Sequence, residues 1–263
     1  MSDPFQQGLA EALPAIKALK GNQRKAGASR ASLEALRSAS PRKSSMATGA
    51  SAVPPASFKT LPALREAALV CTRCPHLVAS RKGVVFGVGN PKADLMFVGE
   101  APGADEDEQG EPFVGRAGQL LTKIILAMGF TRDDIYIANV LKCRPDMPAG
   151  ESGNRKPKAK EMETCLPWLE QQISLIKPKA MVALGATAVE GLLGLTEPMG
   201  KLRGQWLDFH EIPVMVTYHP AYLLRNQSIS EKRKVWEDMM LVLERLGRPI
   251  SAKQKRFFTA AGE

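Results

Sequence analysis

Four cysteines are the residues of this 263-residue sequence that are best suited to binding a metal. The pair in "CTRC" is followed by a third cysteine after 68 intervening residues and by a fourth after another 21. Four thiolates suit either structural zinc or an iron–sulfur cluster, and the spacing alone does not separate the two. A thioredoxin-like redox pair would explain only the first two cysteines. The candidate ligands are Cys71, Cys74, Cys143 and Cys165.

A glycine- and acid-rich stretch, "GEAPGADED" (99–107), follows an apolar run and predicts a tight turn with free backbone amides. It carries Glu100 and Glu106, two carboxylates close to this turn. Further along, Phe113 lies among polar loop residues in "EPFVGRAG". A loop aromatic of this kind is either a packing lid or a stacking platform for a planar ligand.

An asparagine and a histidine stand at the ends of two other apolar runs. Asn139 in "IANVLKC" is either a hydrogen-bonded structural residue or a reader of a nucleobase edge, because an amide offers a donor and an acceptor together. His219 in "YHPAYLLRN" ends the last apolar run, whereas His76 follows the cysteine pair and His210 lies in a polar turn. We therefore expect His219 to be the functional histidine.

The elements that position these residues are predicted from hydrophobic periodicity. Four apolar, partly β-branched runs alternate with helical patterns, which indicates a mostly parallel sheet with helices on both faces. We predict an α/β fold, a three-layer α/β/α sandwich around a central four-stranded sheet. The predicted strands span 93–101, 134–143, 179–188 and 212–220, and the predicted helices span 61–71, 116–129, 158–177, 188–195 and 230–247.

Ligands of such open sheets bind beyond the carboxyl ends of the strands, so the loops that follow the four runs should converge. Phe113, Asn139 and His219 should then gather around one slot.

The net charge of +9 is unevenly distributed along the chain. Residues 1–60 hold nine basic side chains against three acidic ones, a net charge of +6. Such a tail suits a polyanionic partner, nucleic acid above all, or serves only to solubilise the chain. We predict a basic, disordered extension over 1–60, a folded domain over 61–247 and a basic C-terminal tail over 248–263.

The sequence also indicates the compartment. It contains no apolar run long enough to cross a bilayer and no recognisable secretory signal, so we expect no membrane partner. Four cysteines are too few for a disulfide framework in a chain of this length, which favours a reducing cytoplasm.

Three motifs together resemble the family 4 uracil-DNA glycosylases, the iron–sulfur type of bacteria and archaea. They are "GEAPGADEDEQGEPFVGRAGQLL" (99–121), "NVLKCRP" (139–145) and "HPAYLLRN" (219–226), in the family's order and at similar spacing. The resemblance covers roughly 70% of the chain, residues 64–247. It implies a [4Fe-4S] cluster on the four cysteines, with the segment 146–154 as a short insertion. It also implies a nucleoid-associated protein that acts as a monomer on uracil-containing DNA.

The resemblance assigns roles within the predicted slot. Uracil would be extruded from the base stack, as glycosylases do as a class, and its N-glycosidic bond hydrolysed to leave an abasic site. His219 would donate to uracil O2, with help from the backbone of Ala101. Phe113 would stack on the base, and Asn139 would bind the O4/N3 edge and so reject cytosine.

The resemblance leaves the water-handling group open. Another glycosylase branch carries an aspartate where this chain has Ala101, so Glu100 and Glu106 are the candidate catalytic carboxylates. For DNA binding, Arg225 would contact phosphate. Leu223 would either fill the gap left by the flipped nucleotide or start a packed helix.

Three alternatives have no glycosylase turnover. A protein that traps uracil-DNA covalently would need an extra histidine in 143–162, and this segment has none. A DNA-associated iron–sulfur protein that senses redox state would not need an intact slot. A zinc-stabilised nucleotide-binding protein would use the same four cysteines.

Overall fold

The computed structural model describes residues 57–148, 150–151 and 153–259. Its contacts divide the chain into Met1–Pro54 and Pro55–Glu263, and all described residues belong to the second unit. The predicted disordered extension therefore lies almost wholly outside the described residues. The proposed division at residues 61 and 247 stays a prediction.

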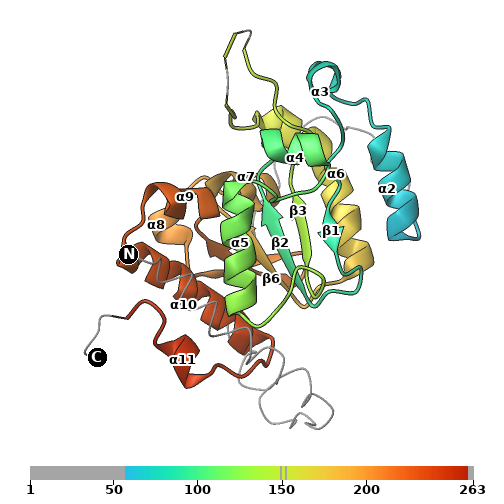
Figure 1. The fold of residues 1–263 in the computed structure, drawn as a ribbon. Helices are drawn as coiled ribbons and strands as arrows, with labels where there is room; N and C mark the ends of the chain where they lie inside the picture. The colour runs from blue at the N-terminus through green and yellow to red at the C-terminus, as the bar shows by residue number, and fades with distance from the viewer. Residues whose placement is uncertain (1–56, 149, 152, 260–263) are drawn as a thin grey trace. The chain divides into compact units, whose positions relative to one another are not determined.

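A six-stranded sheet forms the centre of the second unit, in the order β1-β3-β2-β4-β6-β5 (Figure 1). The four inner strands are parallel, and the two edge strands pair antiparallel to them. The inner strands are β2 (Leu95–Gly99), β3 (Tyr136–Asn139), β4 (Ala180–Leu184) and β6 (Ile212–Thr217). The edge strands are β1 (Val88–Gly89) and β5 (Trp206–Phe209).

The predicted α/β sandwich and its four parallel strands are confirmed, but the predicted strand count for the whole sheet was wrong. Every residue of β2, β3 and β4 is buried, which is why these strands read as continuous apolar runs. The edge strands lack that signal, because β1 has two residues and β5 is only partly buried.

Helices cover both faces of the sheet. On one face, Met96, Val98, Met181 and Ala183 pack in one apolar cluster with residues of α6 (Ala159–Ile176) and α7 (Ala186–Leu193). Side chains alternate along a strand, so Phe97 and Val182 point to the opposite face. Figure 1 shows α5 (Arg116–Ala127) and α10 (Ile229–Arg245) on that side.

Shorter helices complete the fold. They are α2 (Leu61–Leu69), α3 (Pro75–Ser80), α4 (Ala104–Gln109), α8 (Met199–Leu202), α9 (Pro220–Arg225) and α11 (Ala252–Lys255). The last of these packs on α10, because Trp236 Nε1 donates to the Gln254 carbonyl at 2.6 Å. None of the described helices is long and apolar enough to cross a membrane.

The register of the inner strands brings their carboxyl ends, where the polar loops begin, to the same level. Gly99 pairs with Asn139, and Leu184 pairs with Thr217, so these strands end at one edge of the sheet. The loops that leave this edge carry the candidate site residues. The sheet therefore supplies the convergence that the sequence predicted.

A buried carboxylate fixes the end of β6. Asp238 on α10 is fully buried, accepts a hydrogen bond from Thr217 Oγ1 at 2.6 Å and is paired with the Arg203 guanidinium. Because Thr217 is the last residue of β6, this contact sets where the loop containing His219 begins.

Replacing Asp238 by Ala should lower the free energy of unfolding by about 3 to 5 kcal/mol, because it leaves the Arg203 charge without its partner. Urea denaturation measures the change. The matched control is Glu237→Ala on the same helix, whose ion pair with Arg233 has side chains 45% and 25% exposed and should contribute less than about 1 kcal/mol. Equal losses in the two variants would contradict this account.

Candidate functional site

A cavity of about 340 Å³ lies at the carboxyl edge of the sheet. Its volume falls in the usual range for small-molecule sites. The prediction that one aromatic ring, one amide and one imidazole share a slot is confirmed, since Phe113, Asn139 and His219 all line this cavity. The other predicted residues in its wall are Glu100, Ala101, Glu106 and Arg225.

Phe113 is held in the cavity wall from both sides of its loop. The ring is 6% exposed, and its centroid lies 5.7 Å from that of His219. The residue adopts a positive φ of 57°, a conformation that costs free energy outside glycine. Arg132 offsets this cost by donating to the carbonyl oxygens of Pro112 and Phe113 at 2.8 and 3.2 Å.

Glu106 braces the same loop from the other side. Its Oε1 accepts hydrogen bonds from the backbone N–H groups of Val114 and Gly115, each at 2.9 Å. Its Oε2 accepts from the backbone of Gly103 at 3.0 Å. These bonds make Glu106 a positioning residue for the Phe113 loop, and its predicted catalytic role stays a prediction.

Asn139 is aimed at the cavity by a glycine on the neighbouring strand. A Cβ on Gly99 would lie 2.4 Å from Asn139 Oδ1 and 2.5 Å from Phe113 Cζ, so the two side chains occupy the space of a missing side chain. Asn139 is 2% exposed, and its Oδ1 has no hydrogen-bond partner among the described residues. A buried acceptor left unpaired costs about 1 to 3 kcal/mol, so the site is built for a donor that a ligand supplies.

His219 presents one defined ring nitrogen to the cavity. It is the N-cap residue of α9, and its Nδ1 accepts a hydrogen bond from the backbone N–H of Ala221 at 3.1 Å. The proton of the neutral ring therefore lies on Nε2. Burial, with a smaller effect of the Arg225 charge, lowers the pKa of His219 to about 4. The imidazole is neutral at pH 7 and offers Nε2–H as a donor.

Among the described residues, no backbone N–H group donates to the carboxylate of Glu100, which also lines the cavity. Burial raises its pKa, against the opposing effects of a hydrogen bond from Thr187 and the charge of Lys156. It follows β2 directly, next to Ala101. Arg225 lies at the exposed end of α9, where its guanidinium can reach a phosphate.

Among the predicted catalytic, base-binding and DNA-binding residues, Leu223 is the one that does not line the cavity. It is 2% exposed and lies on the buried side of α9, the helix that packs on α5. A wedge must be exposed to enter a base stack. The wedge role predicted for Leu223 is therefore at odds with its position, and the packed-helix alternative fits.

The four cysteines come from three segments and meet in one place. Cys71 and Cys74 stand between α2 and α3, Cys143 follows β3, and Cys165 lies in α6. All four belong to or pack against one apolar cluster with Leu64, Leu77 and Trp168. Burial and the neighbouring sulfurs raise the pKa of Cys74 to about 11. A bound cation would relieve this crowding of thiolates.

Two of the sulfurs accept hydrogen bonds. Arg81 donates to Cys143 Sγ at 2.8 Å, and the Lys142 backbone donates to Cys165 Sγ at 3.2 Å. These bonds favour the thiolate, the form that binds a metal, while burial raises the pKa of both thiols.

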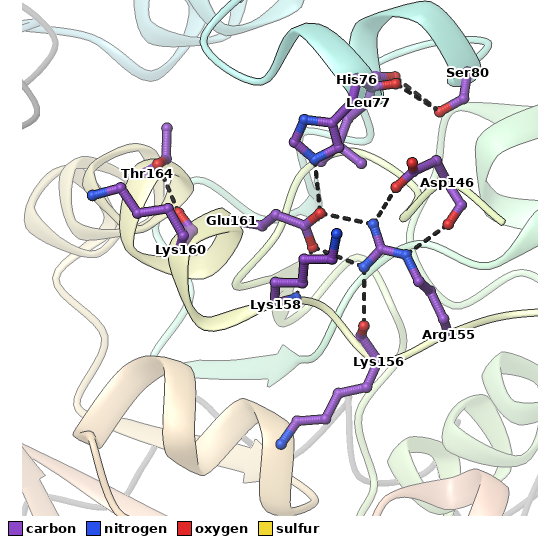
Figure 2. Close-up of polar contacts among 10 residues, drawn as sticks. All are labelled: His76, Leu77, Ser80, Asp146, Arg155, Lys156, Lys158, Lys160, Glu161 and Thr164. Carbon is purple, nitrogen blue, oxygen red and sulfur yellow. Dashed lines mark hydrogen bonds and ion pairs between the residues drawn. The ribbon is translucent and has the colours of Figure 1, made fainter. Parts of the chain in front are cut away.

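The sequence interpretation missed part of the cavity wall. Asn154 and Arg155 line the cavity, and Arg155 is bound by Asp146 and by the buried carboxylate of Glu161 (Figure 2). Hydrogen bonds from Arg155 and its neighbours outweigh the effect of burial and lower the pKa of Glu161 to about 2. The available signal was the insertion 146–154, which ends at this wall but was interpreted only as a longer loop.

Comparison with known proteins gives a consistent result. The family model described as "Uracil DNA glycosylase superfamily" matches residues 86–240. The chain is 45% identical over 172 residues to the Type-4 uracil-DNA glycosylase of Thermotoga maritima, covering 64% of this chain and 85% of that protein. It is 42% identical over 174 residues to the Type-4 enzyme of Pyrobaculum aerophilum, covering 63% and 85%. For the Type-4 enzyme of Archaeoglobus fulgidus the identity is 39% over 170 residues, covering 62% and 82%.

Replacing Leu223 by Ala should act on stability, because it removes a buried side chain of α9. The expected loss in free energy of unfolding is about 2 to 3 kcal/mol. Leu224→Ala on the same helix is the control, and since Leu224 is only partly buried its loss should be clearly smaller. A Leu223 variant with native stability would show that this side chain is available for another role.

Proposed function

The chain belongs to the uracil DNA glycosylase superfamily, and on this premise we propose that it hydrolyses the N-glycosidic bond of uracil in DNA and leaves an abasic site. One observation carries the proposal: Phe113, Asn139 and His219 line a single cavity. The names of the relatives, Type-4 uracil-DNA glycosylases, support the same activity. Cytoplasmic localisation and action as a monomer stay predictions.

The cavity can distinguish uracil from cytosine through Asn139. Its unpaired Oδ1 accepts from N3–H of uracil, while its amide nitrogen donates to O4. Cytosine carries an acceptor at N3 and an amino group at C4, so it would present the opposite pattern to both atoms. Phe113 supplies the stacking surface that binds any planar base. Asn139 therefore provides selectivity, and Phe113 provides base affinity.

His219 acts on the leaving group. Breaking the glycosidic bond places negative charge on uracil and positive charge on the sugar. A neutral imidazole with its proton on Nε2 can donate to O2 as that charge forms, and a dry cavity strengthens this interaction. The backbone N–H at Ala101 lies in the same wall and supplies a second donor.

We assign Glu100 one of two roles: it activates the attacking water molecule, or it stabilises the positive charge that forms on the sugar. Its side chain lines the cavity, and Glu106 is already occupied by three backbone N–H groups. Arg225 is assigned to a DNA phosphate beside the flipped nucleotide, since it lines the cavity and lies at the exposed end of α9.

The four cysteines would hold a [4Fe-4S] cluster. Cys71, Cys74, Cys143 and Cys165 are an all-sulfur ligand set that such clusters use. The group would supply a covalent tie between the 71–74 segment, the end of β3 and α6. Because Cys143 lies four residues beyond Asn139, this tie would also stiffen one wall of the cavity.

The direct test is incubation of the protein with a uracil-containing oligonucleotide, followed by alkali. Strand scission at the former uracil is expected for the native chain. His219→Ala should lower the single-turnover rate constant roughly 10²- to 10³-fold, the usual effect of removing one donor to a developing anion.

The control for this test is His210→Ala, which removes a histidine with a largely exposed side chain and should leave the rate unchanged. Binding of uracil-DNA by the native chain without scission would contradict the proposal and favour binding without turnover. Equal rates for the native chain and His219→Ala would remove the imidazole from the mechanism.

Protein purified without oxygen should be brown, with absorbance near 400 nm that general iron–sulfur chemistry predicts. Cys143→Ser should lose that absorbance and become less stable, because its sulfur joins the end of β3 to the other segments. Iron and zinc analysis of the same samples provides the check. A colourless native protein with one zinc per chain would overturn the cluster assignment.

A further inference from the structure

Glu161, in the first turn of α6, makes four hydrogen-bond contacts with three residues. It is 3% exposed. Arg155 donates to Oε1 at 2.7 Å and to Oε2 at 2.9 Å, and the Lys158 backbone donates to Oε2 at 2.7 Å. His76 Nε2 lies 2.8 Å from Oε1 (Figure 2).

Arg155 has no N–H group left for a ligand. Besides Glu161, its guanidinium donates to the carbonyl oxygen and carboxylate of Asp146 and to the carbonyl of Lys156. Guanidinium has five N–H donors, and these contacts use all of them. Arg155 therefore lines the cavity but has no N–H group with which to bind a phosphate or a base. These contacts indicate that Arg155 holds other residues of the protein in place and does not bind a ligand.

The neighbour of Arg155 in the cavity wall is Asn154. Asn154 also lines the cavity, and its Nδ2 lies 3.2 Å from the place where a Cβ on Gly103 would be. The next residue on the other side, Lys156, is paired with Glu190 of α7. The short segment 154–156 is thus attached to α6 through the partly buried Arg155 and to α7 through Lys156.

The attachment through Arg155 also contacts the segments that bear the cysteines. His76 lies two residues beyond Cys74, Asp146 three residues beyond Cys143, and Glu161 one helical turn before Cys165. Figure 2 shows all three side chains around the Arg155 guanidinium. Their ligand atoms lie within 4.8 Å of one another, but a metal ion there would have to displace this guanidinium.

We infer that Glu161 and Arg155 are positioning residues, which fix Asn154 against the flipped nucleotide and tie this wall to the cysteine-bearing segments. The inference rests on the proposed glycosylase activity and assigns part of its geometry. A wall that restrains the nucleotide affects the rate of bond breaking. The affinity for DNA comes mostly from phosphate contacts, which this wall does not make.

Arg155→Lys is the main test, because lysine keeps the charge but cannot span both carboxylates. Single-turnover excision at saturating protein should slow roughly 10- to 100-fold, the effect of a wall displaced by about 1 Å. The protein concentration that gives half the maximal rate should change less than about threefold, since phosphate contacts are intact. Glu161→Gln, which keeps the size of the side chain and loses its charge, should give the same pattern.

Lys160→Gln is the matched control, since it removes one charge from an exposed ion pair with Glu163 in the same turn of α6. Its rate should equal that of the native chain. Melting temperature and absorbance near 400 nm are measured on every variant. A native rate in Arg155→Lys would overturn the inference. So would a rate loss matched by weaker DNA binding, or one explained by loss of folded, cluster-containing protein.

A readout without DNA separates this inference from the proposed function. Hydrogen exchange of the Lys158 backbone amide, which donates to Glu161 Oε2 at 2.7 Å, should be faster in Arg155→Lys than in the native chain, whether or not the protein excises uracil. Unchanged exchange would contradict the positioning role. Failure of the native chain to cleave uracil-DNA would contradict the proposed function instead.

Discussion

The site depends on the close approach of Asn139 and Phe113 over Gly99. The parallel register pairs Gly99 with Asn139, so the amide and the backbone of the neighbouring strand end at the same level. No Cβ fits at position 99, because Asn139 Oδ1 and Phe113 Cζ lie 2.4 and 2.5 Å from where it would be. The cavity is therefore made by omitting a side chain at the end of a buried strand, and any residue other than glycine would fill or distort it.

This arrangement lowers the stability of the fold, and the surrounding contacts offset part of that loss. Asn139 Oδ1 has no partner among the described residues, and Phe113 adopts a positive φ. Glu106 and Arg132 hold the Phe113 loop through four backbone hydrogen bonds, which stabilise a conformation that the loop would not adopt alone. Local strain at a site that binds a ligand is a recurrent pattern in proteins, since the ligand completes the missing interactions.

The sequence predicted the inner sheet and most of the cavity for the same physical reason. Strands buried on both faces leave continuous apolar runs, and parallel strands carry their following loops to one edge. Four separate motifs could thus be brought together before any coordinates were known. The two edge strands left no such signal, because β1 is short and β5 is partly exposed. The resemblance drawn from three of the motifs is confirmed by the family model and by the relatives.

What the sequence could not predict depends on side-chain direction and on contacts across the fold. Leu223 and Leu224 are adjacent and chemically identical, and only the way α9 lies on the fold decides that Leu223 is the buried one. Similarly, Glu106 lies in an acidic run that suggests catalysis, yet its carboxylate faces three backbone N–H groups. Spacing along the chain identifies which residues are available, and the tertiary contacts determine which of them remain free to act.

The ion network that joins Arg155 to the buried Glu161 and to the partly exposed Asp146 follows from the same requirement for fixed direction. An apolar contact would join the inserted segment to α6 at least as favourably, because the desolvation of a buried ion pair offsets much of its attraction. Apolar contacts, however, tolerate sliding and rotation, whereas a guanidinium between two carboxylates has one orientation. Since the segment must present Asn154 at the cavity and also meet the segments that carry the cysteines, orientation matters more here than net stability. A directional ion network is the interaction that meets this requirement.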